Sequence, residues 1–199
     1  MGELAIKREK PFDRVYRYYD AFMRFWRLFS SDGFLSILDL KGYETVADIG
    51  GGTGQIAGEL APHCAKVYVV DESGGMLSRV KKSEKIIPVR RDAISTGFPD
   101  DSIDVIIISD VLHHIENQQG LFSEMRRICR PGGILLLQDF DLAMPKTKLL
   151  RLFEFLLFGP LHFRKRIAVE NLLCGQGFTK ESEILSDFSY VQLWRKGRK

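Results

Sequence analysis

A glycine-rich segment in the first third of the chain has the residue types of a ligand-binding loop. It reads Asp48-Ile49-Gly50-Gly51-Gly52-Thr53-Gly54 and follows a short apolar run. Glycine permits backbone conformations with positive φ, and it removes side chains where a ligand must lie against the main chain. A helix is expected to begin at the loop, and the first amide groups of a helix face whatever lies before it. The number of glycines exceeds the need of a tight turn, so the segment indicates a small-molecule site.

The spacing of these glycines separates the classes of ligand. A dinucleotide-binding loop would need a third glycine where Gln55 stands, and no lysine with Ser or Thr follows to make a phosphate-binding loop. Asp71 ends the next apolar run, at a place where a carboxylate can accept both hydrogen bonds of a ribose diol. Alone, Asp71 could be an ordinary charge at a strand end. Together, the loop and the carboxylate favour a ribose-containing ligand.

Two adjacent histidines could move a proton. His113 and His114 follow Ser109 and Asp110 at the end of a later apolar run. Histidine is the side chain best placed to accept a proton near neutral pH. The alternative is that both rings cap a turn or stack beside a ligand. Because neighbouring residues usually point in different directions, at most one is expected to act as a base, and no metal site is expected.

Apolar runs alternate with helical patterns through most of the chain. Strands are predicted at 45–49, 66–70, 85–89, 103–109 and 134–138, with helices at 54–60, 75–82 and 118–129 between them. This alternation predicts a doubly wound α/β sheet, and the nearly continuous apolar strands indicate a sheet covered on both faces. Helices at 146–158 and 167–173 follow, then strands at 178–184 and 188–194. With no long helix between them, the last two strands should pair antiparallel.

Two aromatic-rich helices are expected outside the alternating core. Apolar residues at three- and four-residue spacings predict one helix over 12–29, followed by a short helix at 34–40. The chain is expected to form a single domain over 1–199, with a helical cap at 1–43 and a helical insertion at 143–167. Both additions are expected to cover a substrate pocket, and packing against the core is the alternative.

Composition narrows the class of partner. The net charge of +3, from 29 basic and 26 acidic residues, is too small to indicate nucleic acid as the partner. Three cysteines without metal-ligand spacing or a secretory signal favour the cytoplasm. No apolar stretch reaches the length that crosses a bilayer, and the basic triplet at 164–166 gives only weak support for contact with a membrane surface.

Five segments in register resemble the class I S-adenosylmethionine-dependent methyltransferases. They are the glycine loop, Asp71, Arg91-Asp92-Ala93, the run from Phe98 to Val105, and the segment 125–133. Ile103 stands where this family usually has phenylalanine. The opening Phe12-Asp13 with Tyr18-Tyr19-Asp20 is similar to the ubiquinone/menaquinone C-methyltransferases. The segment 109–114 is closer to the general small-molecule subfamily.

The resemblance implies a fold, a cofactor and a set of residues. The fold is a Rossmann-like α/β sheet of seven strands in the order 3-2-1-4-5-7-6, mostly parallel, with the last two strands antiparallel and helices on both faces. The cofactor is S-adenosylmethionine, with Asp92 accepting from the adenine amino group. The implied cofactor-binding residues are Tyr19, Asp48, Gly50, Gly51, Gly52, Gly54, Asp71, Glu72, Met76, Asp92, Ala93 and Ser109.

The expected reaction is methyl transfer to a small, apolar or aromatic molecule, with His113 and His114 as candidate catalytic residues. Two alternatives stay open at this point. One is a methyltransferase for a polar metabolite or a protein side chain, and the other is a cofactor-binding module without catalysis. An aliphatic pocket would favour the first expectation, and an open polar groove would favour the polar substrates.

Overall fold

The computed structural model describes residues 37–187 and 189–198, and the side chains of five residues in one helix are outside that description. The predicted helix over 12–29 and the candidate residue Tyr19 lie outside the described residues. Of the short helix predicted at 34–40, residue 37 is helical and residues 38–40 are not, so the helix ends earlier than predicted. That segment instead brings Leu38 into the core beside the sheet.

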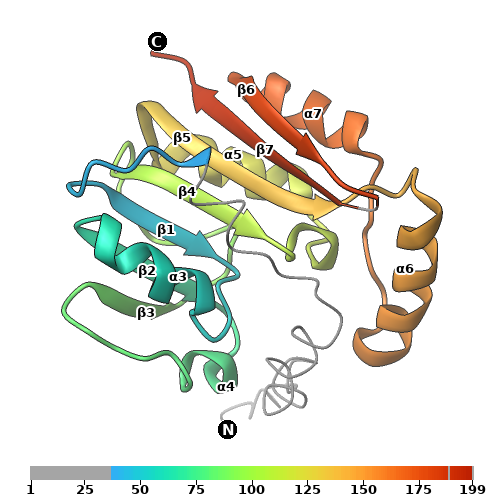
Figure 1. The fold of residues 1–199 in the computed structure, drawn as a ribbon, viewed down its shortest axis with the longest axis horizontal. Coiled ribbons are helices and arrows are strands. Elements are labelled where there is room, and N and C mark those ends of the chain that lie inside the picture. The colour runs from blue at the N-terminus through green and yellow to red at the C-terminus, as the bar shows by residue number, and fades with distance from the viewer. Residues whose placement is uncertain (1–36, 188, 199) are drawn as a thin grey trace, which may run out of the picture.

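Seven strands form one sheet in the order β3-β2-β1-β4-β5-β7-β6 (Figure 1). The neighbours among β1 to β5 pair in parallel, whereas β7 pairs antiparallel with both β5 and β6. This order and the two antiparallel strands confirm the predicted fold. The strands are β1 (Thr45–Ile49), β2 (Lys66–Asp71), β3 (Ile86–Arg90), β4 (Ile103–Ser109), β5 (Cys129–Phe140), β6 (Phe178–Leu185) and β7 (Ser189–Lys196).

Helices cover both faces of the sheet. Side chains of successive strand residues point to opposite faces, so each buried strand presents apolar residues to the helices on both sides. In β4, Val105 and Ile107 pack with helix α3, while Ile106 and Ile108 pack with helices α5 and α7. Both apolar layers are almost completely buried. The helical segments are α3 (Gln55–Leu60), η1 (Ala61–His63), α4 (Gly74–Leu77), η2 (Leu112–His114), α5 (Gln118–Ile128), α6 (Pro145–Phe158) and α7 (Arg166–Gly175).

Two predicted elements differ in length from those observed. The helix predicted at 75–82 is the four-residue α4, which ends in turns that carry Val80 under the glycine loop, close to Gly54. The strand predicted at 134–138 is the longer β5, which begins at Cys129. Ile103 pairs with Cys129 and Val105 pairs with Ile134, so a bulge absorbs the extra residues. A bulge of this kind interrupts the apolar pattern from which the strand was predicted.

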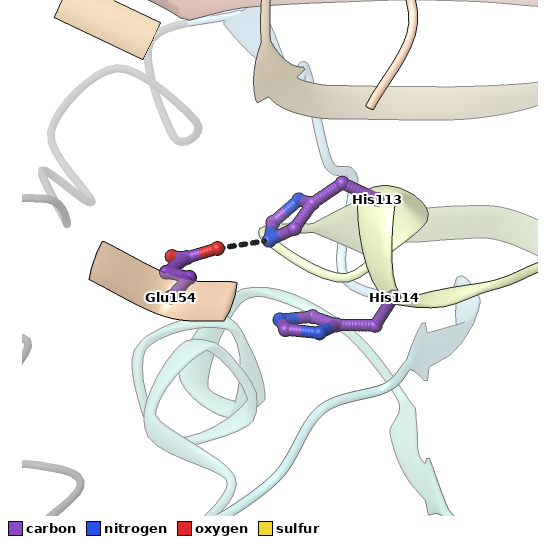
Figure 2. Close-up of side chains that lie close together, drawn as sticks. All are labelled: His113, His114 and Glu154. Carbon is purple, nitrogen blue, oxygen red and sulfur yellow. Dashed lines mark ion pairs between the residues drawn. The ribbon is translucent and has the colours of Figure 1, made fainter. Parts of the chain in front are cut away.

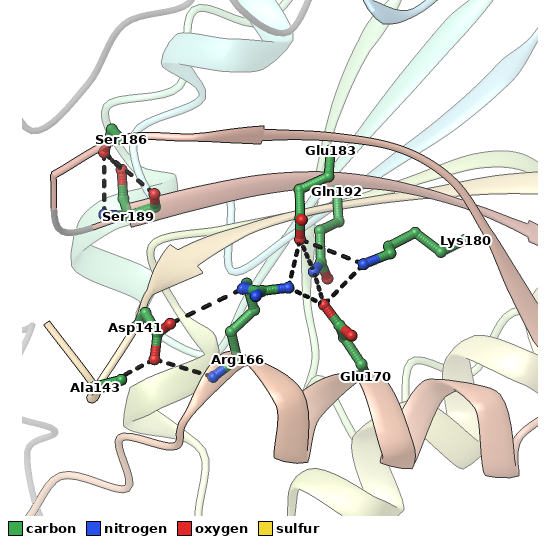
Figure 3. A network of polar contacts seen from close by, with 9 residues as sticks. All are labelled: Asp141, Ala143, Arg166, Glu170, Lys180, Glu183, Ser186, Ser189 and Gln192. Carbon is green, nitrogen blue, oxygen red and sulfur yellow. Dashed lines mark hydrogen bonds and ion pairs between the residues drawn. The ribbon is translucent and has the colours of Figure 1, made fainter.

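A polar network fixes the beginning of α7 against the end of the sheet (Figure 3). The Arg166 side chain pairs with Glu170 and with Glu183 of β6, and its backbone amide donates to Asp141 at 3.1 Å. Gln192 of β7 donates to both glutamates at 2.7 and 2.6 Å. In chain order α6 follows β5 and precedes α7, and it stands beyond the carboxyl ends of β4 and β5 (Figure 1). In the described ranges, no helix has the length and apolar character needed to cross a membrane.

A second polar cluster ties the segment after β3 to α5. The Glu124 carboxylate is 8% exposed and accepts hydrogen bonds from the Thr96 amide at 2.9 Å and the Thr96 hydroxyl at 2.6 Å. Arg127 donates to the same carboxylate at 2.7 Å and is the main cause that lowers the pKa of Glu124 to about 2. Since Thr96 follows Asp92 and Ala93 closely in the chain, this cluster positions one wall of the candidate cofactor site.

We expect Glu124→Gln to lower the free energy of unfolding by about 1–2 kcal/mol, because an amide replaces a carboxylate that accepts charge-assisted hydrogen bonds. The pKa of Glu124 is lowered on folding from 4.5 to about 2. Its contribution is therefore fully present above pH 4.5 and is lost as the pH falls towards about 2. Urea unfolding from about pH 3 to about pH 7 tests this, with Glu84→Gln at an exposed position as the control. Equal acid sensitivity in wild type and Glu124→Gln would contradict the assignment.

Candidate functional site

The glycine loop continues directly from β1 and lies close to the end of β4. Gly50 has φ +71°, and its amide donates to the carbonyl of Val70 at 2.7 Å. A Cβ atom at Gly50 would lie 2.5 Å from Cγ2 of Val111, so no larger residue fits without movement. Gly52 has φ +54°, and a Cβ there would meet nothing nearer than 4.0 Å. The loop therefore presents bare backbone to the space in front of it.

Asp71 holds the loop and the following turn together. Its Oδ2 accepts from the amide of Gly52 at 3.0 Å, and its Oδ1 accepts from the amide of Ser73 at 2.8 Å. Two backbone amides thus fix the carboxylate at the carboxyl end of β2. A carboxylate oxygen has lone pairs enough to accept further hydrogen bonds from a ligand.

A pocket of about 400 Å³ lies at the carboxyl ends of β1, β2 and β4. This size suits a small organic ligand. Of the predicted cofactor set, seven residues line it: Gly50, Gly52, Asp71, Glu72, Met76, Asp92 and Ala93. Sequence reasoning missed several further lining residues, which are Arg91, Ile94, Asp110, Val111, Ile115, Glu116 and Asn117. Most of these neighbour predicted residues on the same connections, so the rule that ligands lie at strand ends could have found them.

The other described members of the predicted set lie behind the pocket wall. Asp48 is 1% exposed, and a Cβ at Gly51 would lie 2.5 Å from its Oδ2. Gly54 packs against Val80, and the Ser109 hydroxyl donates to Gln138 at 3.0 Å. These residues shape the loop and do not line the pocket. Their direct contact with a cofactor stays a prediction.

Two buried carboxylates beside the pocket lack hydrogen-bond partners among the described residues. Both oxygens of Asp48 and Oδ1 of Asp110 are in this state. Burial, with the nearby charge of Asp71, raises the pKa of Asp48 to about 7. Burial also raises the pKa of Asp110 well above its ordinary value. Because Asp110 lines the pocket, a positively charged ligand group there would supply the missing partner.

His113 lies in a buried row of ionisable groups. It is 2% exposed, and its Nδ1 lies 2.8 Å from Oδ1 of Asp139 in β5. Its Nε2 lies 3.1 Å from Oε2 of Glu154 in α6. Although burial opposes the charge, Asp139 and Glu154 hold the pKa of His113 well above its usual range. Its ring also stacks on Phe163, with 4.4 Å between ring centroids.

His114 is the histidine that lines the pocket. Burial and the neighbouring His113 hold the pKa of His114 well below its usual range. The centroids of the two rings are 4.2 Å apart, so the expectation that neighbouring histidines point apart is wrong. The tight η2 turn carries both rings to the same side of the chain.

The same turn brings three possible metal donors together. Side-chain donor atoms of His113, His114 and Glu154 lie within 4.8 Å of one another (Figure 2). The expected absence of a metal rested on the wrong premise about neighbouring histidines, and it stays a prediction.

Two residues of the basic triplet at 164–166 make polar contacts within the protein. Arg164 donates to Gln118 at 2.6 Å, and Arg166 joins the network near α7.

Comparison with known proteins agrees with this geometry. Residues 47–137, from β1 through most of β5, match a family model described as a methyltransferase domain. This match, together with the sheet order and the pocket at the strand ends, supports a class I S-adenosylmethionine-dependent methyltransferase. It is 34% identical over 138 residues to the demethylmenaquinone methyltransferase of Mycobacterium tuberculosis strain H37Rv, covering 65% of this chain and 57% of that protein. The corresponding enzyme of Corynebacterium glutamicum is 36% identical over 104 residues, covering 52% and 45%. The chain thus spans less than two thirds of these relatives.

Solved structures show the same fold at low sequence identity. A chain in the complex of the Haloferax volcanii Trm112 methyltransferase activator with a candidate methyltransferase has a TM-score of 0.84 and 13% identity. That match covers 95% of this chain and 99% of the other. A candidate methyltransferase from Bacillus halodurans has a TM-score of 0.73 and 20% identity, covering 84% and 99%.

The cofactor of this methyltransferase family is S-adenosylmethionine, and the pocket residues fit it. Gly52 offers an open backbone position, and Asp71 lies where a ribose diol can donate to it. The partnerless Asp110 oxygen suits a cofactor that carries an ammonium and a sulfonium group. Asp92 and Ala93 line the pocket near Met76 and Ile94, where an adenine ring would find apolar contacts.

Proposed function

We propose that this methyltransferase-family protein transfers a methyl group from S-adenosylmethionine to a small, apolar or aromatic molecule. The observation that carries the proposal is one pocket that extends from Asp71 at the end of β2 to Asp110 and His114 after β4. When bound, the cofactor supplies an electrophilic methyl group on its sulfonium. The residues of the chain would hold the acceptor in line with it, and proximity and orientation lower the barrier by several kcal/mol, up to about 7–11 in the best cases.

We assign His114 the role of candidate base. It lines the pocket and is neutral near neutral pH, because its pKa is lowered, so it can accept a proton from an acceptor that is not already ionised. His113 lies nearer to the end of β4 in the sequence, but its Nε2 faces Glu154 (Figure 2). His113 is therefore proposed to support the site through its neighbour.

The apolar character of the substrate rests on two observations. Val111 and Ile115 line the pocket near His114, and Phe140, Phe163 and Leu150 form an apolar cluster beside His113. Two curated relatives are named demethylmenaquinone methyltransferase. We propose that the insertion at 143–167, which contains α6, covers the substrate. A polar substrate or a protein side chain is the second candidate, and Asp110, Glu116 and Asn117, which line the same pocket, are the observation that favours it.

We expect S-adenosylhomocysteine to bind with one site per chain in isothermal titration calorimetry. The reason is the single pocket that joins the glycine loop, Asp71 and Asp92. NAD serves as the control ligand, because the loop lacks the third glycine of a dinucleotide site. Tight NAD binding without binding of S-adenosylhomocysteine would overturn the cofactor assignment.

Transfer itself is tested with tritium-labelled cofactor against demethylated quinones, phenols and small amines. Label in an organic-extractable product supports the apolar substrate, whereas label only in water-soluble products supports the polar one. Cofactor binding without any transfer would favour the rival function of a binding module.

A cytoplasmic location and a partner that is a small molecule, not nucleic acid, belong to the same proposal. They rest on the cysteine content and on the small net charge.

A further inference from the structure

The helix α6 carries one buried acid on the side that faces the sheet. Thr147, Leu150 and Glu154 follow one another at three- and four-residue spacings, so they share one face of the helix. Thr147 and Glu154 are buried, whereas Leu152 and Phe155 on other faces are more than half exposed. Glu154 is the only acidic residue of α6, and it meets His113.

The contact between Glu154 and His113 is favourable when the imidazole ring of His113 carries its second proton. The Asp139 carboxylate lies on one side of the imidazole, 2.8 Å from Nδ1, and the Glu154 carboxylate lies on the other, 3.1 Å from Nε2. A neutral ring can donate to only one of them, which leaves a nitrogen lone pair facing the other carboxylate. An imidazolium keeps the hydrogen bond to Asp139 and places its positive charge beside Glu154, where Nε2 and Oε2 form an ion pair without the geometry of a hydrogen bond. Because burying an unpaired carboxylate is costly, the docked position of α6 favours the charged ring.

We propose that Glu154 is a positioning residue which, when α6 is docked, holds His113 as an imidazolium and thereby keeps the adjacent His114 neutral at the pocket. This inference rests on the proposed function, since it concerns the histidine assigned as the candidate base. It adds a role for α6 that differs from covering the substrate. The helix brings the charge that sets the protonation of the histidine pair.

The other ionisable groups around the pair agree with this assignment. Asp110 follows β4, Asp139 and Glu154 flank His113, and the backbone amide of His162 donates to the carbonyl of His113 at 2.6 Å. His162, Arg164 and Tyr190 border the same region, and burial favours the neutral form of Asp110, so the two carboxylates that flank His113 are the groups that favour its positive charge. The pKa of His113 is raised and that of His114 is lowered, and the ring-to-ring distance of 4.2 Å explains why a charge on one opposes a charge on the other.

Undocking of α6 from His113 is then coupled to loss of a proton from the His113 ring. When the helix leaves, His113 loses one carboxylate and its affinity for a proton falls. By the same linkage, loss of the proton weakens the docking of α6. His114 becomes easier to protonate in that state, because the opposing charge beside it is gone.

The experiment is an NMR titration of the imidazole nitrogens in the full chain with ¹⁵N-labelled histidine. The chain has four histidines, and single His→Gln variants at the other positions assign the signals. In wild type, His113 should titrate above the ordinary value of about 6.5, and His114 below it. In Glu154→Gln, both values should move towards about 6.5 by at least about half a pH unit. Asp187→Asn is the control, because it removes the exposed ion pair of α6 with Lys146 and leaves the histidine pair unchanged.

A second variant separates loss of charge from loss of fold. Glu154→Leu removes the carboxylate but keeps an apolar contact, so α6 should still dock while His113 again loses affinity for a proton. Unchanged titration of both histidines in both variants would overturn the proposal. It would also be overturned if wild-type His113 were neutral at about pH 7, or if added ZnCl₂ bound to the pair and to Glu154, which would indicate a metal site instead. None of these readouts needs a methyl acceptor, so failure of the proposed function leaves them interpretable.

Discussion

Replacing Asp71 with alanine is expected to weaken the binding of S-adenosylhomocysteine by about 10- to 150-fold, equivalent to about 1.5–3 kcal/mol. We propose that the carboxylate accepts from both hydroxyl groups of the cofactor's ribose. It also accepts from the amides of Gly52 and Ser73, so its loss releases the loop that borders the same pocket. Two contributions therefore act in the same direction, one through the ligand and one through the shape of the loop.

Calorimetry on a panel of variants separates these contributions. Asp71→Asn keeps one acceptor oxygen and should lose less affinity than the alanine variant. Cys174→Ser changes an exposed residue of α7 and should bind as wild type does. An alanine variant that binds within about twofold of wild type, a difference of less than half a kcal/mol, would show that Asp71 does not hold the ribose.

Replacing His114 with glutamine is expected to lower the turnover number by at least about 100-fold, the range found for general bases. Glutamine keeps a polar side chain of similar size but cannot accept a proton near neutral pH. Since the pocket extends well beyond His114, to Asp71 and Asp92, cofactor affinity should change little. The measurement is a pH–rate profile with an acceptor found by the tritium screen.

The sign of the pH dependence follows from the lowered pKa of His114. The base is active when neutral, so wild-type activity should fall only below the ordinary histidine value of about 6.5. His63→Gln on η1 is an exposed control that should leave the profile unchanged. If the His114 and His113 variants both keep wild-type turnover and pH dependence, catalysis works by positioning alone, and the acceptor arrives already ionised.

The sheet was predictable because each of its strands carries a local signal. The bounds of β1 and β4 agree with the apolar runs from which they were predicted, since buried parallel strands are apolar along their whole length. The helix α4 was predicted too long, because four residues are too few to show helical periodicity. The bulged start of β5 was missed because its pairing with β4 depends on another strand.

The candidate site likewise contains residues that could be predicted from the sequence and residues that could not. The glycine loop and Asp71 could be found from spacing, because both lie at strand ends that the sequence marks. Asp139 and Glu154 could not be assigned to the histidine pair, since each is an ordinary acid in sequence and only the fold brings it to His113. The unexpected proximity of the two histidine rings depends on the tight η2 turn, which has no periodic pattern.

The close approach of Gly50 to Val111 joins two positions that are far apart in sequence. The missing Cβ at one position makes room for a branched side chain at the other, so the two should covary among relatives. An alanine in place of Gly50 would require a smaller residue in place of Val111, and the backbone would still resist because of the positive φ. The side chain at position 111 therefore acts as a spacer between the first and fourth strand ends. Exchanging valine for alanine or leucine there offers a way to adjust the width of the pocket beside His114 while leaving the end beside Asp71 as it is.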